Sequence, residues 1–390
     1  MNSPLRALAL LLVVSSVTLA DDPPRLDLFT ARTGGYVTYR IPGLVVTARG
    51  TLLAYCEARK GTGDWAPIDV MLRRSTDGGK TWEPARKIAE APADAERNPV
   101  ATGRDAGQGP TINNPVAIAD PGSGSVYFLY CVNYARCFVM RSDDDGQTFS
   151  EAAEITKTFD KFRDQYDWKV LATGPGHGIR LHSGWLIMPV WLSTGAGRGG
   201  HRPSCVATIY SDDNGHSWQR GQIVVNDTPE TPNPSESTAA QLPDGRVMLN
   251  IRCESSRYRR LVSISSDGAT NWSKPIFDES LIDPICEASL LRMPGKDILA
   301  FANPANPEAN SATVTPGPAK GKPRKNLTLR FSEDAGKTWA RSTVIDAEIA
   351  GYCDLAADAH GTIYCLYERG GANGNIFDTV ALTLVTINPP

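Results

Sequence analysis

The sequence lacks a strong excess of charge of either sign. Its 390 residues contain 40 lysines and arginines against 43 aspartates and glutamates, which gives a formal net charge of −3. Such a chain has no general attraction to the phosphates of nucleic acids or to anionic lipid. We therefore expect no nucleic-acid partner and no role at a membrane surface.

Metal-binding motifs and long apolar runs are also missing. The chain has five histidines and neither an HExxH nor a CxxC motif, so we expect no metal and no cofactor. The apolar run at residues 7–14 is too short to span a bilayer. Because Arg6 precedes it and small residues follow as far as Ala20, residues 1–20 are predicted to be a cleavable signal peptide. The mature protein, residues 21–390, would then be secreted or periplasmic, without membrane insertion.

Cysteines are present but define no framework. An exported chain with eight cysteines can form disulfides, although a chain of this length does not need them to hold a core. Cys131 and Cys137, and Cys353 and Cys365, are the closest pairs, and each could cross a hairpin. The spacing establishes no pairing, and the oligomeric state stays open.

The strongest pattern present is a repeated eight-residue segment. Four copies fit S-x-D-x-G-x-[ST]-[WF], and a degenerate fifth copy occupies residues 265–272; the four are residues 75–82, 142–149, 211–218 and 332–339. In each copy the aspartate can accept backbone N–H groups, the glycine permits positive φ, and the aromatic ring can cover apolar surface. We interpret the segment, called the clasp from here on, as a structural hairpin turn rather than a catalytic motif.

The spacing of the clasps predicts the architecture. Successive copies start about 64 residues apart on average, the size of one four-stranded sheet with its loops. Between them the chain reads as short strands bounded by turn residues, with no long helical periodicity. These strands are expected at residues 40–46, 50–55, 126–132, 185–191, 246–251, 297–302 and 362–367. We predict an all-β fold: one six-bladed β-propeller of four-stranded antiparallel blades over residues 21–390, with 303–325 a loop within a blade.

Three arginine segments recur poorly between the repeats. They are Tyr39-Arg40-Ile41-Pro42, the strand end Asn250-Ile251-Arg252, and Arg324 shortly before the last clasp. Together with the clasps they resemble the signature of the exo-α-sialidases (neuraminidases), whose arginine-containing YRIP segment precedes several such Asp boxes. The resemblance covers essentially the whole mature chain and implies a pocket on the face opposite the clasps.

The resemblance implies a carboxylate-binding triad. In sialidases three arginines clamp the carboxylate of sialic acid, and Arg40, Arg252 and Arg324 match those positions. Guanidinium suits this task because it is planar, always charged and carries paired donors. Arg324 is preferred over the nearby Arg330, which lies within the strand that leads to the clasp. Arg59 resembles the family arginine beside the sugar O4, with a salt bridge to Glu57 as the alternative.

The resemblance also implies the catalytic residues. Asp64, on the loop 61–65, matches the acid/base aspartate, and its rival Asp69 begins a strand. Tyr352 matches the nucleophile, and Glu236 matches the glutamate that activates it. A neutral phenol suits this role because an Asp or Glu nucleophile would meet the negative carboxylate of the substrate, and sialidases are a known exception to the two-carboxylate scheme.

The expected function is therefore that of a secreted, retaining exo-α-sialidase acting on sialylated glycans. Two other classes stay open. One is a non-catalytic carbohydrate-binding propeller, because fold alone does not fix function. The other is a propeller hydrolase or transferase that acts on a related 2-keto acid sugar.

Overall fold

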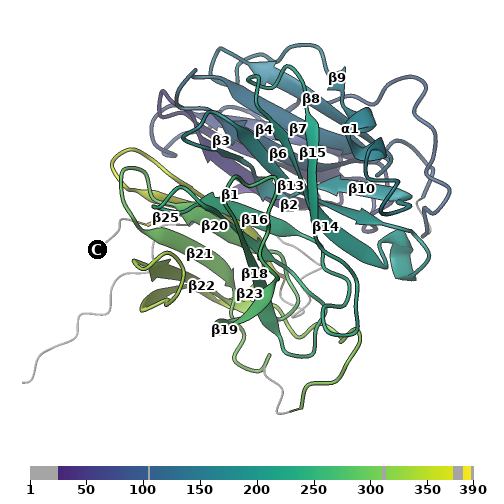
Figure 1. Cartoon of the computed structure of the whole chain (residues 1–390). Helices are drawn as coiled ribbons and strands as arrows, with labels where there is room; N and C mark the ends of the chain where they lie inside the picture. Colours follow the sequence, from purple (N-terminus) through teal and green to yellow (C-terminus); the bar gives the residue numbers. More distant parts are fainter. Residues whose placement is uncertain (1–24, 104–105, 310–312, 372–380, 388–390) are drawn as a thin grey trace, which may run out of the picture.

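The chain folds almost entirely into β-strands (Figure 1). The computed structural model describes residues 25–103, 106–309, 313–371 and 381–387. Within these ranges the helices are two short segments, α1 (Thr156–Asp160) and the 3-10 helix η1 (Arg198–Gly200). The predicted all-β fold is confirmed, whereas the predicted signal peptide lies outside the described residues.

The strands form antiparallel sheets that follow one another along the chain. The first sheet contains β2 (Thr38–Val46), β3 (Leu52–Arg59), β4 (Ile68–Ser75) and β5 (Arg86–Lys87). The second contains β6 (Ile112–Ala119), β7 (Val126–Val132), β8 (Arg136–Ser142) and β9 (Ala153–Glu154), with β11 (Gly176–His177) pairing parallel to β6. The third contains β10 (Val170–Thr173), β13 (Leu186–Ser193), β14 (Ser204–Ser211) and β15 (Gln219–Val225), with β12 (Ile179–Arg180) on β13.

The remaining strands form two further sheets. The fourth sheet contains β16 (Ser237–Gln241), β17 (Val247–Ile251), β18 (Arg259–Ser265) and β19 (Ile276–Ile282). The fifth runs in the order β20 (Ser289–Arg292), β21 (Leu299–Pro304), β22 (Lys325–Ser332), β23 (Arg341–Ala357), β24 (Ile363–Arg369), β25 (Ala381–Ile387) and β1 (Arg25–Thr30).

The predicted six separate four-stranded blades need correction. The described residues form five hydrogen-bonded sheets, of which the fifth has seven strands. The cause is β23, whose 17 residues pair with β22 over the first part and with β24 over the second. One continuous strand therefore joins what the repeat spacing predicted as two units. The regions expected to be strands nevertheless all contain observed strands.

The hydrophobic core lies between neighbouring sheets: each sheet packs against the next along the chain, and the fifth packs against the first. Tyr55 of the first sheet and Phe128 of the second meet edge-on with ring centroids 5.1 Å apart. Leu52 of the first sheet and Leu384 of the fifth belong to one buried cluster, which brings the first and last sheets together. In the fifth sheet, β1 pairs with β25, so the two ends of the described chain lie side by side (Figure 1). This is the propeller-like arrangement that the repeat predicts.

The clasps are hairpin turns built by local hydrogen bonds, as predicted. In the first copy, Asp77 Oδ1 accepts the backbone N–H groups of Lys80 at 3.1 Å and Thr81 at 2.9 Å. Asp77 Oδ2 accepts the Thr81 hydroxyl at 2.6 Å. The hydrogen bonds from Thr81 come first among the contacts that lower the pKa of Asp77 to about 2. Asp144 and Asp334, in the second and last clasps, make equivalent bonds and also have pKa values of about 2.

Each clasp also contacts the preceding sheet through its glycine. A Cβ added at Gly215, in the third sheet, would lie 2.4 Å from the Tyr127 ring of the second. One added at Gly336, in the fifth, would lie 2.5 Å from Met248 of the fourth. Positive φ angles of +77° and +81° are a second reason for glycine at these two positions. The clasps therefore hold neighbouring sheets together.

The clasps and the predicted site residues lie at opposite ends of the same strands. Strand β3 begins at Leu52, which pairs with the clasp residue Ser75, and ends at Arg59. Strand β17 begins at Val247, which pairs with the clasp residue Ser265, and Arg252 directly follows its other end. Strands of this length place the two ends roughly 20 Å apart.

Two other sequence expectations concern cysteines and membranes. All eight cysteines are described, buried and unbridged, although Cys131 and Cys137 are direct cross-strand partners. Within the described residues, none of the helices has the length and apolarity needed to cross a bilayer.

Candidate active site

One large cavity of about 960 Å³ opens among the strand ends opposite the clasps. Its lining contains all seven residues that the sequence singled out: Arg40, Arg59, Asp64, Glu236, Arg252, Arg324 and Tyr352. These residues come from three of the five sheets, the first, the fourth and the fifth, and from the adjoining loops. The structure therefore brings together side chains up to 312 positions apart, and their catalytic roles remain predictions.

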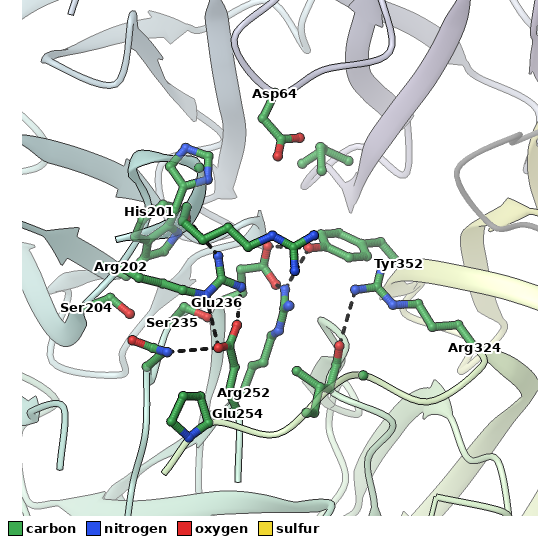
Figure 2. Close-up of a pocket in the computed structure, with 18 of the residues that line it drawn as sticks. Asp64, His201, Arg202, Ser204, Ser235, Glu236, Arg252, Glu254, Arg324 and Tyr352 are labelled. Carbon is green, nitrogen blue, oxygen red and sulfur yellow. Dashed lines mark hydrogen bonds and ion pairs between the residues drawn. The ribbon is translucent and has the colours of Figure 1, made fainter. Parts of the chain in front are cut away.

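Tyr352, Glu236 and Arg252 meet in the middle of this cavity (Figure 2). Tyr352 lies on β23 and donates its hydroxyl hydrogen to Glu236 Oε1. Arg252 Nη1 donates to Tyr352 Oη at 2.9 Å and also pairs with Glu236 Oε2. Glu236 directly precedes β16 and Arg252 directly follows β17, so one hairpin places both at the same end of the fourth sheet.

The electrostatics of this group favour a neutral phenol beside an ionised carboxylate. Burial would raise the pKa of Glu236, but the charge of Arg252 and the hydrogen bond from Tyr352 lower it below its usual value. Burial, followed by the negative charge of Glu236, holds the pKa of Tyr352 well above its usual value. Glu236 is thus a ready acceptor for the Tyr352 proton, while Arg252 stands ready to stabilise the oxygen that loses it.

The other two arginines of the predicted triad flank the Tyr352 ring. The guanidinium carbons of Arg40 and Arg324 lie 5.3 Å and 5.2 Å from its centroid. Arg324 Nη2 donates to the backbone oxygen of Ile285 at 3.2 Å. Three guanidinium groups therefore surround one phenol, which gives the cavity a strongly positive centre.

Glu368 holds Arg40 in place and was not predicted. Its two carboxylate oxygens accept Arg40 Nε at 3.0 Å and Arg40 Nη2 at 3.2 Å. The same carboxylate accepts the backbone N–H groups of Ile41 at 3.1 Å and Tyr352 at 3.2 Å. Glu368 therefore fixes the clamp arginine and the backbone of the tyrosine relative to each other.

Arg59 bridges two carboxylates. The salt bridge to Glu57, considered as the alternative, is present, and Arg59 lines the cavity as well. It donates to Glu57 Oε2 through Nε at 2.9 Å and Nη2 at 2.6 Å, and to Asp64 Oδ1 through Nη1 at 2.8 Å. Against the effect of burial, Arg59 and then His201 and Arg40 lower the pKa of Asp64 well below its usual value. The Asp64 side chain is 47% exposed to the cavity.

The two rival residues lie outside the cavity lining. Asp69, the alternative to Asp64, pairs with Lys60 at 3.1 Å and Lys87 at 3.0 Å on the first sheet. Arg330, the alternative to Arg324, donates to Asn303 Oδ1 at 3.1 Å. The preferences for Asp64 and Arg324 therefore agree with the geometry.

An aromatic wall beside Asp64 was also missed. His201 stacks on Trp65 with centroids 5.2 Å apart and contacts Tyr134 at 4.8 Å and Trp191 at 5.5 Å. Burial lowers the pKa of His201 despite the neighbouring Asp64. The wall gives one side of the cavity an apolar surface next to the predicted acid.

A second unpredicted ion pair lies across the cavity from Asp64 (Figure 2). Arg202, after η1, pairs through two nitrogens with the Glu254 carboxylate. Asn233 Nδ2 donates to Glu254 Oε2 at 2.9 Å. This pair ties the loop between β13 and β14 to the segment that follows β17.

Within the described residues, histidine, cysteine, aspartate and glutamate side chains form no group of three or more arranged to hold a metal ion.

Comparison with known proteins identifies the family. A model described as a BNR repeat-like domain matches residues 93–365, and a BNR/Asp-box repeat model matches residues 73–84. The sialidase of Micromonospora viridifaciens is 29% identical over 368 residues, which cover 88% of this chain and 52% of that protein. Sialidase-3 of Bos taurus is 27% identical over 388 residues, covering 86% of each chain.

The fold comparison agrees. The structure of a Hadza microbial sialidase is 26% identical and superposes with a TM-score of 0.71, covering 93% of this chain and 68% of that one. The chain spans about half of the Micromonospora viridifaciens relative and 60% of a sialidase from Bacteroides fragilis. With the family model matching well over half of the chain, this protein belongs to the BNR repeat-like (Asp-box) family and groups within it with the sialidases.

Proposed function

We propose that the protein hydrolyses terminal α-linked sialic acid from glycans, with retention of configuration and with Tyr352 as the nucleophile. The observation that carries the proposal is the Tyr352 hydroxyl, which lies between Glu236 and Arg252 in a cavity that Arg40 and Arg324 also line. The family relationship to sialidases supports the same activity.

The arginines explain the choice of substrate. Sialic acid carries a carboxylate on its anomeric carbon, and paired guanidinium donors bind a carboxylate with charge and geometry together. The same positive field opposes an approach by a cationic sugar. As positive charge develops on the sugar ring, the bound carboxylate stays fixed beside it and stabilises it.

In the first half of the reaction, a bond forms between Tyr352 Oη and the anomeric carbon. The phenolic proton passes to Glu236 along the existing hydrogen bond, and Arg252 Nη1 stabilises the oxygen as it loses that proton. The bond from the anomeric carbon to the aglycone oxygen breaks, and Asp64 supplies the proton that this oxygen needs.

In the second half, Asp64 takes a proton from water, which attacks the same carbon and releases Tyr352. The tyrosine recovers its proton from Glu236, and two successive displacements retain the configuration. Asp64 must be protonated at the start, whereas Arg59 now holds it ionised at 2.8 Å. A sugar hydroxyl that engages Arg59 Nη1 would remove this contact and raise the pKa of Asp64.

Turnover of a fluorogenic α-sialoside tests the proposal. The wild type is expected to release the fluorophore, whereas Tyr352→Phe and Asp64→Ala are expected to lose most of the activity. Replacing one triad arginine by alanine should lower kcat/KM. The loss should correspond to about 1.5–3 kcal/mol of transition-state stabilisation, which is the usual contribution of a charge-assisted hydrogen bond. No release by a folded wild type would contradict the proposal.

The same assay separates the other classes. Binding of a sialoside without turnover would favour the carbohydrate-binding propeller. Transfer of the sugar to an added glycan, detected by mass spectrometry, would favour a transferase. Full activity in Tyr352→Phe would remove the proposed nucleophile and leave the family relationship intact.

We further propose that the protein is exported and that residues 1–20 are its cleaved signal. The support is the short apolar run behind one basic residue. N-terminal sequencing of the protein recovered from its native host is expected to start at Asp21, and a sequence that starts at Met1 would contradict the proposal.

A further inference from the structure

The cavity carries more positive charge than one sialic acid needs. Eight lysine and arginine side chains line it against three carboxylates, whereas the whole chain has a net charge of −3. One sialic acid brings a single negative charge. The excess is therefore concentrated at this site, against the sign of the protein as a whole.

Part of this charge is neutralised within the cavity. Arg59 pairs with Asp64, Arg252 with Glu236 and Arg202 with Glu254. Two buried carboxylates behind the lining, Glu368 and Glu57, also pair with Arg40 and Arg59. Three further cations, Arg198, Lys320 and Lys322, have no carboxylate within ion-pair distance among the described residues. We call these three the cationic rim. Arg198 and Lys320 are exposed, and Lys322 is half-buried with its ammonium nitrogen 5.3 Å from the centre of the Tyr258 ring.

The lysines of the rim stand on a fixed backbone rather than on a loosely held loop. Ala319 N donates to Glu254 O at 2.7 Å, and Lys322 N donates to Pro284 O at 3.1 Å. The Tyr258 hydroxyl donates to Lys320 O at 3.1 Å. The segment 318–322 is thus anchored to the elements that carry Arg252 and Ile285. The backbone positions that carry Lys320 and Lys322 are therefore fixed at the cavity.

Arg198 is held in a similar way on the neighbouring side. Gly197 N donates to Arg202 O at 2.7 Å, and Gly199 O accepts the Trp65 indole N–H at 2.8 Å. Trp65 directly follows Asp64, the predicted proton donor to the leaving group. Arg198 of the rim therefore lies on the side where the aglycone would leave.

We propose that the cationic rim recognises a second anion on the aglycone, so that the preferred substrates are sialosides whose next sugars carry a sulfate ester or a further carboxylate. This inference rests on the proposed function and goes beyond it, because it concerns the aglycone and not the terminal sugar. A cavity of about 960 Å³ is at the upper end of the range for ligand pockets, which leaves space beyond one sugar ring.

The test compares matched substrates. One is sialyl-N-acetyllactosamine, a second is the same glycan with a sulfate ester on its N-acetylglucosamine, and a third is a disialylated lactose. The wild type is expected to show a higher kcat/KM for the second or the third than for the first. Lys320→Ala/Lys322→Ala is expected to lower that ratio about five- to twentyfold, because each partly exposed charge contact contributes a factor of a few. The substrate whose kcat/KM falls more in this double variant shows whether the rim prefers a sulfate ester or a carboxylate.

A double variant at the other strand ends controls for net charge. Lys80→Ala/Lys337→Ala removes two exposed lysines from the clasps, and it is expected to leave the ratio unchanged. Raising the salt concentration should reduce the wild-type ratio, since exposed charges are screened within a Debye length. A wild-type ratio of one or less, or an equal loss in both double variants, would overturn the inference.

Binding keeps this inference separable from the proposed function. The affinities of the same three glycans for Tyr352→Phe are measured by titration calorimetry, which needs no turnover. Tighter binding of the anionic glycans, lost in Lys320→Ala/Lys322→Ala/Tyr352→Phe, would support the rim even if the wild type released no sugar. Equal binding of all three glycans would overturn it even in an active sialidase.

Discussion

The two ends of the β-strands are built on different principles. At the clasp end, each aspartate finds its partners within four residues of itself, as Asp77 does with Ser75 and Thr81. At the cavity end, the decisive partners are remote: Glu236 and Tyr352 are 116 positions apart, and Arg40 and Glu368 are 328. Local bonds can repeat along a chain because each copy is complete in itself. The cavity is assembled once, by the closure of the whole fold.

This difference predicts which property each end controls. The clasps contact the preceding sheet, so changes there should lower stability and spare the chemistry of the folded molecules. Side chains of the cavity face the substrate, so changes there that leave no buried charge unpaired should alter catalysis with smaller effects on folding. Pairs of variants, one at the clasp end and one at the cavity end, test whether stability and catalysis are controlled separately.

The largest expected effect comes from the cavity. Tyr352→Phe should lower kcat for an α-sialoside about a thousandfold or more, because the covalent route loses its nucleophile. Its midpoint of thermal unfolding should stay close to that of the wild type, since only one oxygen is removed. Stopped assays combined with calorimetry check both halves of this expectation. A large drop in the unfolding midpoint would show that the cavity also holds the fold together.

The next effect comes from the clasps. Gly215→Ala places a methyl group 2.4 Å from the Tyr127 ring at a φ of +77°. It should lower the free energy of unfolding by about 2–4 kcal/mol, from left-handed strain and overpacking together. Gly245→Ala is the matched control, because its φ is +91° but nothing lies within 4 Å of the added carbon. It should cost only about 1 kcal/mol. Urea titrations measure both, and equal losses would refute the role of the clasp in sheet contact.

Positioning within the cavity should have a smaller effect on catalysis. Glu368→Gln keeps the shape of the side chain but removes the charge that orients Arg40. We expect a lower kcat/KM, mainly through a higher KM. The decrease should correspond to a loss of about 1.5–3 kcal/mol in transition-state stabilisation. Glu83→Gln provides the control at the clasp end, where Glu83 pairs with Arg74. A change in kcat alone would show that Glu368 acts on the reacting atoms instead.

The smallest effects should distinguish the buried His177–Asp354 pair from the clasps by pH. Burial lowers the pKa of His177 and the contact with Asp354 at 2.7 Å raises it, with a net shift above its usual 6.5. That pair therefore stabilises the fold at acidic pH and loses its contribution as the pH rises through the folded pKa. The clasp residue Asp144, whose pKa is lowered from 3.8 to about 2, contributes above its usual pKa and loses this as the pH falls toward about 2.

Unfolding free energies measured across the pH range check these signs. The difference between wild type and His177→Gln should shrink toward alkaline pH, and the difference between wild type and Asp144→Asn should shrink toward acidic pH. If these differences do not vary with pH, the protonation of His177 and of Asp144 does not contribute to the free energy of unfolding.

The sequence predicted the fold well where the information is local. The clasps, the strand at 126–132 and the all-β class followed from turn chemistry and from the lack of a long helical period. The joining of two expected units by β23 did not, because nothing local distinguishes a strand of 17 residues from two shorter ones. Strand continuity there depends on two different partners, β22 and β24.

Only the site residues that belong to recognisable motifs could be predicted from the sequence. Seven residues matched segments of the sialidase signature, and the structure collects them in one cavity. Glu368, His201 and the Arg202–Glu254 pair carry no such motif, and their importance arises from partners far away in sequence. The position of Glu368 directly after the strand expected at residues 362–367 is the signal that the sequence offered for it.

The most direct measurement of the central claim is to trap the sugar on the enzyme. A fluorinated sialosyl fluoride forms the covalent intermediate and releases it slowly, so the intact mass should increase by one fluorosialyl group. Peptide mapping should locate that group on Tyr352, and Tyr352→Phe should not be labelled. A wild type that turns over sialosides without forming an adduct, or with the adduct on another residue, would contradict the assignment of Tyr352 as the nucleophile.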